Sequence, residues 1–289
     1  MIRSLGIALL LTATSAMAID LRPLWDFAKP ALSEERFRAA LANAQGDDAL
    51  ILKTQIARSW GLRRDFDRAR QILAEVQPQI AQAGAEPQVR YWLELGRTWA
   101  SATHKPEQLT PEAKTQARSA YDRALSIAKA AKLDGLAIDT VHMYAFIDTD
   151  AESGLKWADE GLKLAKASTQ PEARRWEATL RNNRGVALNE LKRHDDALAE
   201  LKTALQLTEA GGNAIDIRVA HWMVANTLRL MGRLDEAREI QLRLEREWEA
   251  DKDPDPYVFE ELEAIYKAQG NAERAAHYAA LLKATEHKK

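Results

Sequence analysis

Residues 180–244 decide the fold, and they read LRNNRGVALNELKRHDDALAELKTALQLTEAGGNAIDIRVAHWMVANTLRLMGRLDEAREIQLRL. Small and apolar residues of the first half recur forty residues later in the second half. The first half carries Gly185, Leu188, Ala197, Leu201 and Ala204, and the matching positions in the second are Ala225, Leu228, Ala237, Gln241 and Leu244. The stretch therefore contains two adjacent copies of one unit.

Each copy has the pattern of a helix, a turn and a second helix. Apolar or small residues recur at steps of three and four, stop near Lys192 or Gly232, and then resume. The small residues have a physical role, because two helices joined by a turn approach closely only where no bulky side chain separates them. Gly185 with Ala197, and Ala225 with Ala237, are placed to allow that approach.

This run of residues resembles the tetratricopeptide repeat (TPR), a two-helix unit with small residues at fixed places. The resemblance implies an all-α fold, a right-handed α-solenoid of about six TPR-like helix-turn-helix repeats over residues 47–289. We expect residues 19–46 to form an N-terminal capping segment and helix, because a solenoid end exposes an apolar face. The markers of the six repeats follow one another at 37 to 48 residues, which is typical of the longer-repeat branch; they are Ala69, Ala117, Gly154, Ala197, Ala237 and Ala275.

Local signals predict several helix ends. Asn213, with Asp216 three residues on, and Asp255 before Pro256 are expected N-caps, and Gly232 is expected to end a helix. Residues 105–116 contain two prolines and are expected to form a longer loop. In the third repeat two registers that differ by one residue fit the pattern, with either His142 or Met143 facing the groove.

Composition and charge limit the classes of partner. The chain has 289 residues, of which 46% are hydrophobic and 29% charged, as in a globular protein. Its formal net charge of −2 gives no argument for binding nucleic acid. The sequence contains no cysteine, which excludes disulfides, thiolate nucleophiles, Cys-based zinc sites and a lipid anchor on cysteine.

The first eighteen residues have the pattern of a cleavable secretory signal. Arg3 supplies the positive start, residues 5–11 the apolar core, and Ala16 to Ala18 the small-x-small cleavage site. We expect cleavage after Ala18 and export to a bacterial periplasm. No later apolar run has the length of a membrane span, so we expect no membrane insertion after cleavage. An uncleaved anchor or a buried first helix remains the alternative.

Catalytic motifs are missing from the sequence. The six histidines show no HxxxH or HExxH spacing, and no phosphate-binding glycine loop or GxSxG nucleophile turn occurs. We therefore expect a protein that is not an enzyme and holds no metal or cofactor. A hydrolase or lyase stays as a third possibility, and it would need His142, Asp139 and a further carboxylate in one cluster.

The TPR resemblance also implies where a partner binds, because the first helix of each repeat lines the concave groove of such solenoids. Carried over repeat by repeat, the candidate binding residues are Gln55, Arg58, Arg90, Glu94, Arg97, Asp139, His142, Asn182, Asn183, Trp222, Asn226, Arg229 and Glu261. These residue types suit a peptide, because Arg can bind its carboxylates, Asn can hydrogen-bond to its backbone, and Trp can pack against its apolar side chains. Intra-groove ion pairs, such as Arg97 with Asp139, are the alternative use of these side chains.

The sequence thus predicts an exported TPR scaffold or adaptor that binds a protein or peptide partner in its concave groove. We expect Arg58, Arg97, Asn183, Asn226 and Arg229 to converge on one groove. A second hypothesis is a small-molecule component of an envelope transport system that binds organic acids in a closed pocket. The partner's identity and the oligomeric state stay open.

Overall fold

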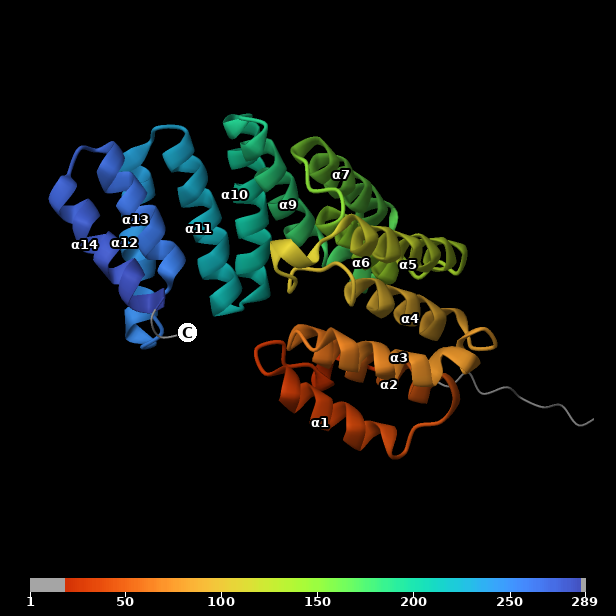
Figure 1. Cartoon of the computed structure of the whole chain (residues 1–289). Coiled ribbons are helices and arrows are strands. Elements are labelled where there is room, and N and C mark those ends of the chain that lie inside the picture. The colour runs from red at the N-terminus through yellow and green to blue at the C-terminus, as the bar shows by residue number, and fades with distance from the viewer. Residues whose placement is uncertain (1–18, 287–289) are drawn as a thin grey trace, which may run out of the picture.

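The structure is a computed structural model that describes residues 19–286, and this part of the chain contains helices and no strands. Figure 1 shows the helices stacked in chain order as a curved row, from α1 at one end to α14 at the other. The helices are α1 (Pro30–Leu41), α2 (Gly46–Leu62), α3 (Phe66–Ile80), α4 (Ala85–Arg97), α5 (Pro111–Ala130), α6 (Asp134–Met143), α7 (Ala151–Ala167), α8 (Pro171–Arg174), α9 (Glu177–Glu190), α10 (His194–Gly211), α11 (Ala214–Leu230), α12 (Leu234–Ala250), α13 (Pro256–Ala268) and α14 (Ala272–Glu286), with short 3₁₀ turns η1 (Arg22–Leu24), η2 (Pro106–Gln108) and η3 (Tyr144–Phe146).

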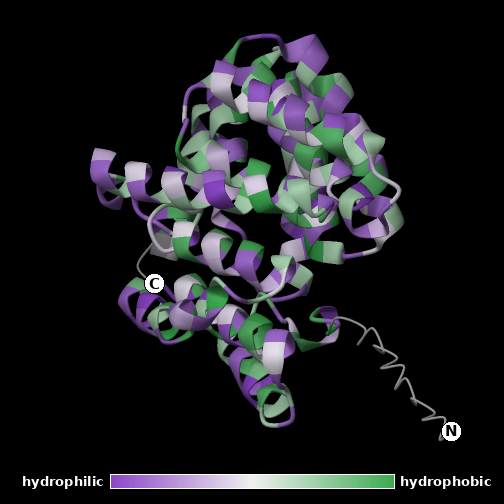
Figure 2. Ribbon diagram, turned by 90° about the vertical axis from the view of Figure 1, so that its right-hand side faces the viewer, coloured by the Kyte–Doolittle hydropathy of each residue, from purple (hydrophilic) through white to green (hydrophobic). Residues whose placement is uncertain are grey.

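Consecutive helices pack in pairs, which confirms the predicted all-α repeat fold. The pairs are α2 with α3, α4 with α5, α6 with α7, α9 with α10, α11 with α12, and α13 with α14. Figure 2 shows hydrophobic and hydrophilic residues mixed along the helices, as expected where each helix buries one side only. The predicted signal peptide, residues 1–18, lies outside the described residues. The domain boundaries at residues 19, 47 and 289 remain predictions.

Side-chain caps set the beginnings of several helices where the sequence predicts them. Asn213 Oδ1 accepts hydrogen bonds from the backbone N–H groups of Ile215 and Asp216 at 3.0 and 3.1 Å. Asp255 Oδ1 accepts one from Tyr257 N–H at 2.9 Å. Gly232, with φ of +77°, follows the end of α11 in the left-handed conformation that glycine adopts without strain. These predicted helix ends are confirmed.

Glycines allow the close approach of paired helices. A Cβ atom placed on Gly185 would lie 2.5 Å from Leu201 Cγ, which confirms the role expected for this small residue. At Gly96 of α4 the added Cβ would lie 2.3 Å from Cε1 of Tyr121 on α5. Tyr121 is fully buried, and its hydroxyl donates to the carbonyl oxygen of Ala100 at 2.6 Å. The two helices of this pair can therefore touch only because residue 96 has no side chain.

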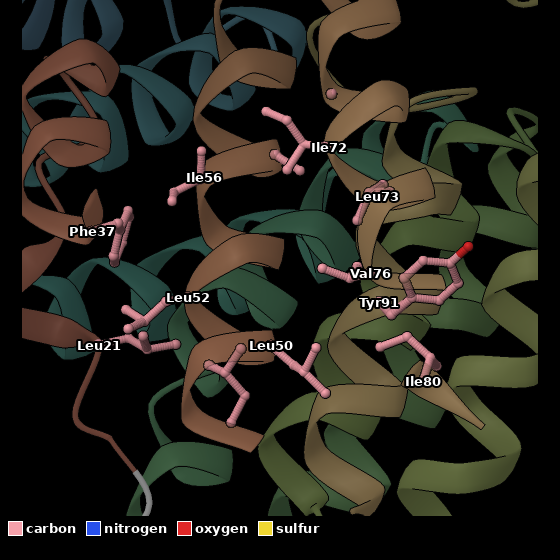
Figure 3. Packing of buried hydrophobic residues seen from close by; sticks show 13 residues of the cluster. Leu21, Phe37, Leu50, Leu52, Ile56, Ile72, Leu73, Val76, Ile80 and Tyr91 are labelled. Atoms are coloured by element: carbon pink, nitrogen blue, oxygen red, sulfur yellow. The ribbon is translucent and has the colours of Figure 1, made fainter. Parts of the chain in front are cut away.

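The N-terminal segment packs on the first pair. Leu21 and Phe37 belong to the same buried cluster as Leu52, Ile56 and Leu73 of α2 and α3 (Figure 3). Trp25 stacks on Phe27 with ring centroids 4.7 Å apart and meets Phe37 edge-on at 4.8 Å. Phe27 itself leaves 58% of its surface exposed, so Trp25 covers the core and Phe27 covers Trp25.

The structure corrects the sequence reading in two places. The expected loop 105–116 is shorter, because α5 already begins at Pro111, where Thr110 Oγ1 caps it by accepting from Ala113 N–H at 3.2 Å. Between the third and fourth pairs the chain forms α8, a four-residue helix that no repeat pattern indicates. This short helix sets the position of Trp176, which lies two residues after its end.

No helix in the stretch 19–286 is both long and apolar enough to cross a membrane.

Candidate functional site

A buried charge cluster joins the first helices of three successive pairs. It consists of Arg58 on α2, Glu94 and Arg97 on α4, and Asp139 on α6. Arg97 Nη1 donates to Glu94 Oε1 at 2.6 Å, and Arg97 Nη2 donates to Asp139 Oδ1. Glu94 is only 2% exposed and Asp139 is also buried. Arg97 therefore holds two carboxylates that are both removed from water.

In this cluster burial and the neighbouring charges shift each pKa in opposite directions. Burial alone lowers the pKa of the Arg97 guanidinium, but the carboxylates of Asp139 and Glu94 outweigh it and raise the pKa above its usual value. Burial alone raises the pKa of Asp139, and the charges of Arg97 and Arg58 outweigh it and lower that pKa. Both groups are thus held in their charged forms.

Arg58 is less well compensated than Arg97. Its Nη1 lies 3.8 Å from Glu94 Oε1, the oxygen that Arg97 already holds, and its buried Nε has no hydrogen-bond partner. Burial and the positive charge of Arg97 lower the pKa of Arg58. Its guanidinium lies 5.4 Å from the ring centroids of both Trp25 and Phe27, which suits cation–π attraction. Arg58 is the cation of the cluster with capacity for another acceptor.

His142 of α6 links the cluster to the fourth pair. Asn183 Nδ2 of α9 donates to His142 Nδ1 at 2.9 Å. The imidazole lies 5.6 Å from the ring of Phe146 and 5.4 Å from that of Trp176. Burial lowers the pKa of His142, and Asp139, which raises it, does not compensate, so the ring is neutral near pH 7. Both residues that the third-repeat register left open reach this region, since His142 and the buried Met143 line the same cavity.

The lowered pKa of His142 predicts a loss of stability in acid. The unfolded imidazole, with a pKa of 6.5, takes up a proton that the folded one does not, so the free energy of unfolding falls as the pH drops through 6.5 toward the lower pKa of the folded state. His104 and His221, whose pKa values are also lowered by burial, act in the same direction. Urea unfolding at three pH values should show a shallower pH dependence for His142→Asn than for the wild type. Equal slopes would contradict the assignment.

Two cavities lie along these first helices, on either side of His142 and Phe146. The N-terminal cavity, about 190 Å³, is lined by the buried charge cluster together with Met143 and Trp176. The central cavity, about 200 Å³, lies between the third and fourth pairs and includes Asn183, Trp157 and Leu180 in its lining. Because both are lined by His142 and Phe146, they are neighbours separated by these two side chains.

A second polar group lies on α11 and α13. The carboxylate of Glu261 accepts from Asn226 Nδ2 at 2.7 Å and from Arg229 at 2.8 and 2.9 Å. The hydrogen bonds that Arg229 donates to the Glu261 carboxylate raise the pKa of Arg229. Nearby, Trp222 Nε1 donates to the carbonyl oxygen of Tyr257 at 3.1 Å. Asn226 and Arg229 line neither cavity, and a groove shared by them with Arg58, Arg97 and Asn183 stays a prediction.

The remaining candidates occupy different environments. Gln55 is fully buried and its Nε2 donates to Thr54 Oγ1 at 3.1 Å, so it belongs to the core and is not exposed on a groove. Arg90 forms a local pair with Glu86 at 2.8 Å. Asn182 is half-buried beside Asn183 and lines neither cavity. Sequence reasoning missed Phe146, which lies in the 3₁₀ turn η3, and Trp176, which lies between α8 and α9.

The N-terminal cavity brings together the residues that the third hypothesis names, since His142, Asp139 and Glu94 all line it, but their hydrogen bonds are made to other residues. The hydrogen bonds of Asp139 and His142 go to Arg97 and Asn183, and none joins these two residues to each other. Among residues 19–286 no group of three His, Asp or Glu side chains is placed to hold a metal ion.

Comparison with known proteins identifies the repeat. Residues 176–246 match the family model described as tetratricopeptide repeat. The solved structure of PilW, described as a widely conserved type IV pilus biogenesis factor, is 20% identical with a TM-score of 0.58, and the match covers 83% of this chain and 95% of PilW. No curated protein matches the sequence.

Two other solved structures have similar folds. A signal-transduction ATPase with a tetratricopeptide-repeat sensor from Pyrococcus horikoshii is 14% identical with a TM-score of 0.62, over 90% of this chain and 39% of that one. The Rap protein in complex with Competence and Sporulation Factor is 12% identical with a TM-score of 0.58, over 89% of this chain and 71% of that one. At these identities the likeness concerns the fold alone.

Proposed function

We propose that this chain, whose residues 176–246 match the tetratricopeptide-repeat family model, is an exported, non-catalytic scaffold that binds a protein or peptide partner along its first helices. The observation that carries the proposal is the pair of neighbouring cavities lined from α2, α4, α6 and α9. An extended peptide would place successive side chains in them, while Arg58, which has no close acceptor of its own, would bond a peptide oxygen.

The proteins of similar fold support the proposed function by analogy. The Rap structure holds Competence and Sporulation Factor, so a solenoid of similar fold takes a partner. PilW, a pilus biogenesis factor, is compatible with a location in the cell envelope. With the predicted cleavage after Ala18, the mature chain would begin at Ile19 in the periplasm, and the mass of the chain recovered from the periplasmic fraction tests this step.

Binding of an organic acid is the second candidate, favoured by Arg58 in the N-terminal cavity. That cavity, about 190 Å³, is smaller than the several hundred Å³ typical of small-molecule pockets. Arg97 and Glu94 also neutralise each other there, which leaves little net charge for an anion. The dimensions and charge therefore favour a peptide, which can extend over both cavities.

The test is capture of partners from envelope extract of the source organism by the mature chain, followed by mass spectrometry. The informative variant combines Arg58→Gln with Asn183→Ala, because both residues line the cavities and neither is the centre of a buried ion pair. The matched control combines Arg246→Gln with Asn43→Ala, which change the same residue types at exposed positions outside the cavities.

We expect a protein that is retained by the wild type and the control and lost by the double variant. Equal retention by all three chains would overturn the assignment of the binding site. If no chain retains a protein and an organic acid raises the melting temperature of the wild type only, the second candidate replaces the first.

A further inference from the structure

The central cavity combines apolar walls with carboxylates at the surface. Leu180 and Ala187 in its lining are buried, and Ala145 and Val186 add further apolar surface. Asp150 and Glu190 are exposed, and Asp148 is half-buried. No Lys or Arg belongs to the described residues that line this cavity.

The three carboxylates are only partly compensated. Asp148 accepts from Arg118 with Oδ1 and from Trp157 Nε1 with Oδ2 at 3.0 Å. Asp150 Oδ1 caps α7 by accepting from Ser153 N–H at 2.8 Å, which leaves its charge without a cation. Within residues 19–286 the side chain of Glu190 forms neither a hydrogen bond nor an ion pair. The nearby cations are Arg118 and Lys156, whose Nζ lies 4.8 Å from the ring centroid of Trp157, so three carboxylates outnumber two cations and the cavity has a negative balance.

We propose that the central cavity takes a Lys or Arg side chain of the bound peptide, an inference that rests on the proposed function. Such a side chain has an apolar stem and a charged end. The stem would lie against Leu180, Val186 and Ala187, and the charged end would meet Glu190 and Asp150 at the surface. Any purely apolar side chain would leave both carboxylates without a counter-charge.

The neighbouring groups favour this cavity over the other for a basic side chain. His142, which lines both cavities, is neutral and adds no positive charge. In the N-terminal cavity the charges of Arg58 and Arg97 are balanced by those of Glu94 and Asp139, so this cavity offers a cation no net attraction. Because the cavities share His142 and Phe146 as a wall, one extended segment can reach both, with its basic residue in the central cavity.

The experiment selects binding peptides from a displayed library of random heptapeptides with the mature chain as bait. We expect the selected peptides to share one position occupied by Lys or Arg. The dissociation constant of a selected synthetic peptide should rise about tenfold or more for Glu190→Lys, by a smaller factor for Glu190→Gln, and should increase with salt. The matched control is Glu273→Lys, an exposed carboxylate of α14 outside the cavities.

The outcomes separate this inference from the proposed function. Peptides that bind tightly but share no basic position, or that bind Glu190→Lys as tightly as the wild type, overturn the inference and leave the proposed function standing. An equal loss with Glu273→Lys also overturns it, because the effect would then come from net charge alone. If the library yields no binder for the wild type, the proposed function itself fails, and the inference with it.

Discussion

Replacing Arg97 by Ala is expected to lower the free energy of unfolding by about 3–5 kcal/mol. The variant leaves Glu94 and Asp139 buried with only Arg58 nearby, and that guanidinium lies 3.8 Å from Glu94. Uncompensated charges in a buried site cost far more than the net contribution of the pair they belonged to. Urea unfolding of the wild type and Arg97→Ala, followed by circular dichroism, measures the difference.

A second variant distinguishes buried charge from lost packing. The quadruple variant Arg58→Met, Arg97→Met, Glu94→Gln and Asp139→Asn removes all four charges of the cluster at similar volume, and we expect it to recover most of the lost stability. As a surface control, Arg233→Ala breaks an exposed pair with Glu236 and should cost very little stability. A loss of that small size for Arg97→Ala would show that the cluster is hydrated in solution.

Replacing Gly96 by Val is expected to lower the free energy of unfolding by about 1–3 kcal/mol, the usual cost of overpacking. The added Cβ alone would lie 2.3 Å and 2.5 Å from two ring carbons of Tyr121. The ring cannot easily move away, because it is buried and its hydroxyl is bonded to Ala100. Thermal unfolding should show the loss as a lower melting temperature.

The control for this prediction is Gly211→Ala in α10. A Cβ atom there meets nothing within 4 Å, and the position is helical. Alanine at such a site restricts the unfolded chain and should leave stability unchanged or raise it by up to about 1 kcal/mol. Equal stability of Gly96→Val and Gly211→Ala would contradict the prediction, because it would mean that α4 and α5 can move apart without loss of stability.

The burial of Arg97 also affects how the groove is tested. A variant that removes Arg97 with Asn183 and Arg229 would lose partner binding through unfolding as readily as through lost contacts. Arg58 and Asn183 are better choices, because one has a single long ion-pair contact and the other is a neutral amide at the border of the central cavity.

The order of small and large residues determined the repeat and its helices. Gly185 with Leu201 and Gly96 with Tyr121 are local partners within one pair, so the spacing along the chain contains the information needed to predict their contact. The caps at Asn213 and Asp255 are likewise interactions over two or three residues. Such features follow from the sequence because the chain itself holds the partners together.

Only the tertiary structure decided what the groove residues do. Arg97 and Asp139 are 42 residues apart, and the stacking of α4 on α6 makes the ion pair that the sequence left as an alternative. On α2 Gln55 is buried, and on α11 Asn226 and Arg229 bond to Glu261 of α13. The irregular helix α8 brings Trp176 to His142. These outcomes depend on the angle between successive pairs, a property of packed surfaces that no periodic pattern of residues specifies.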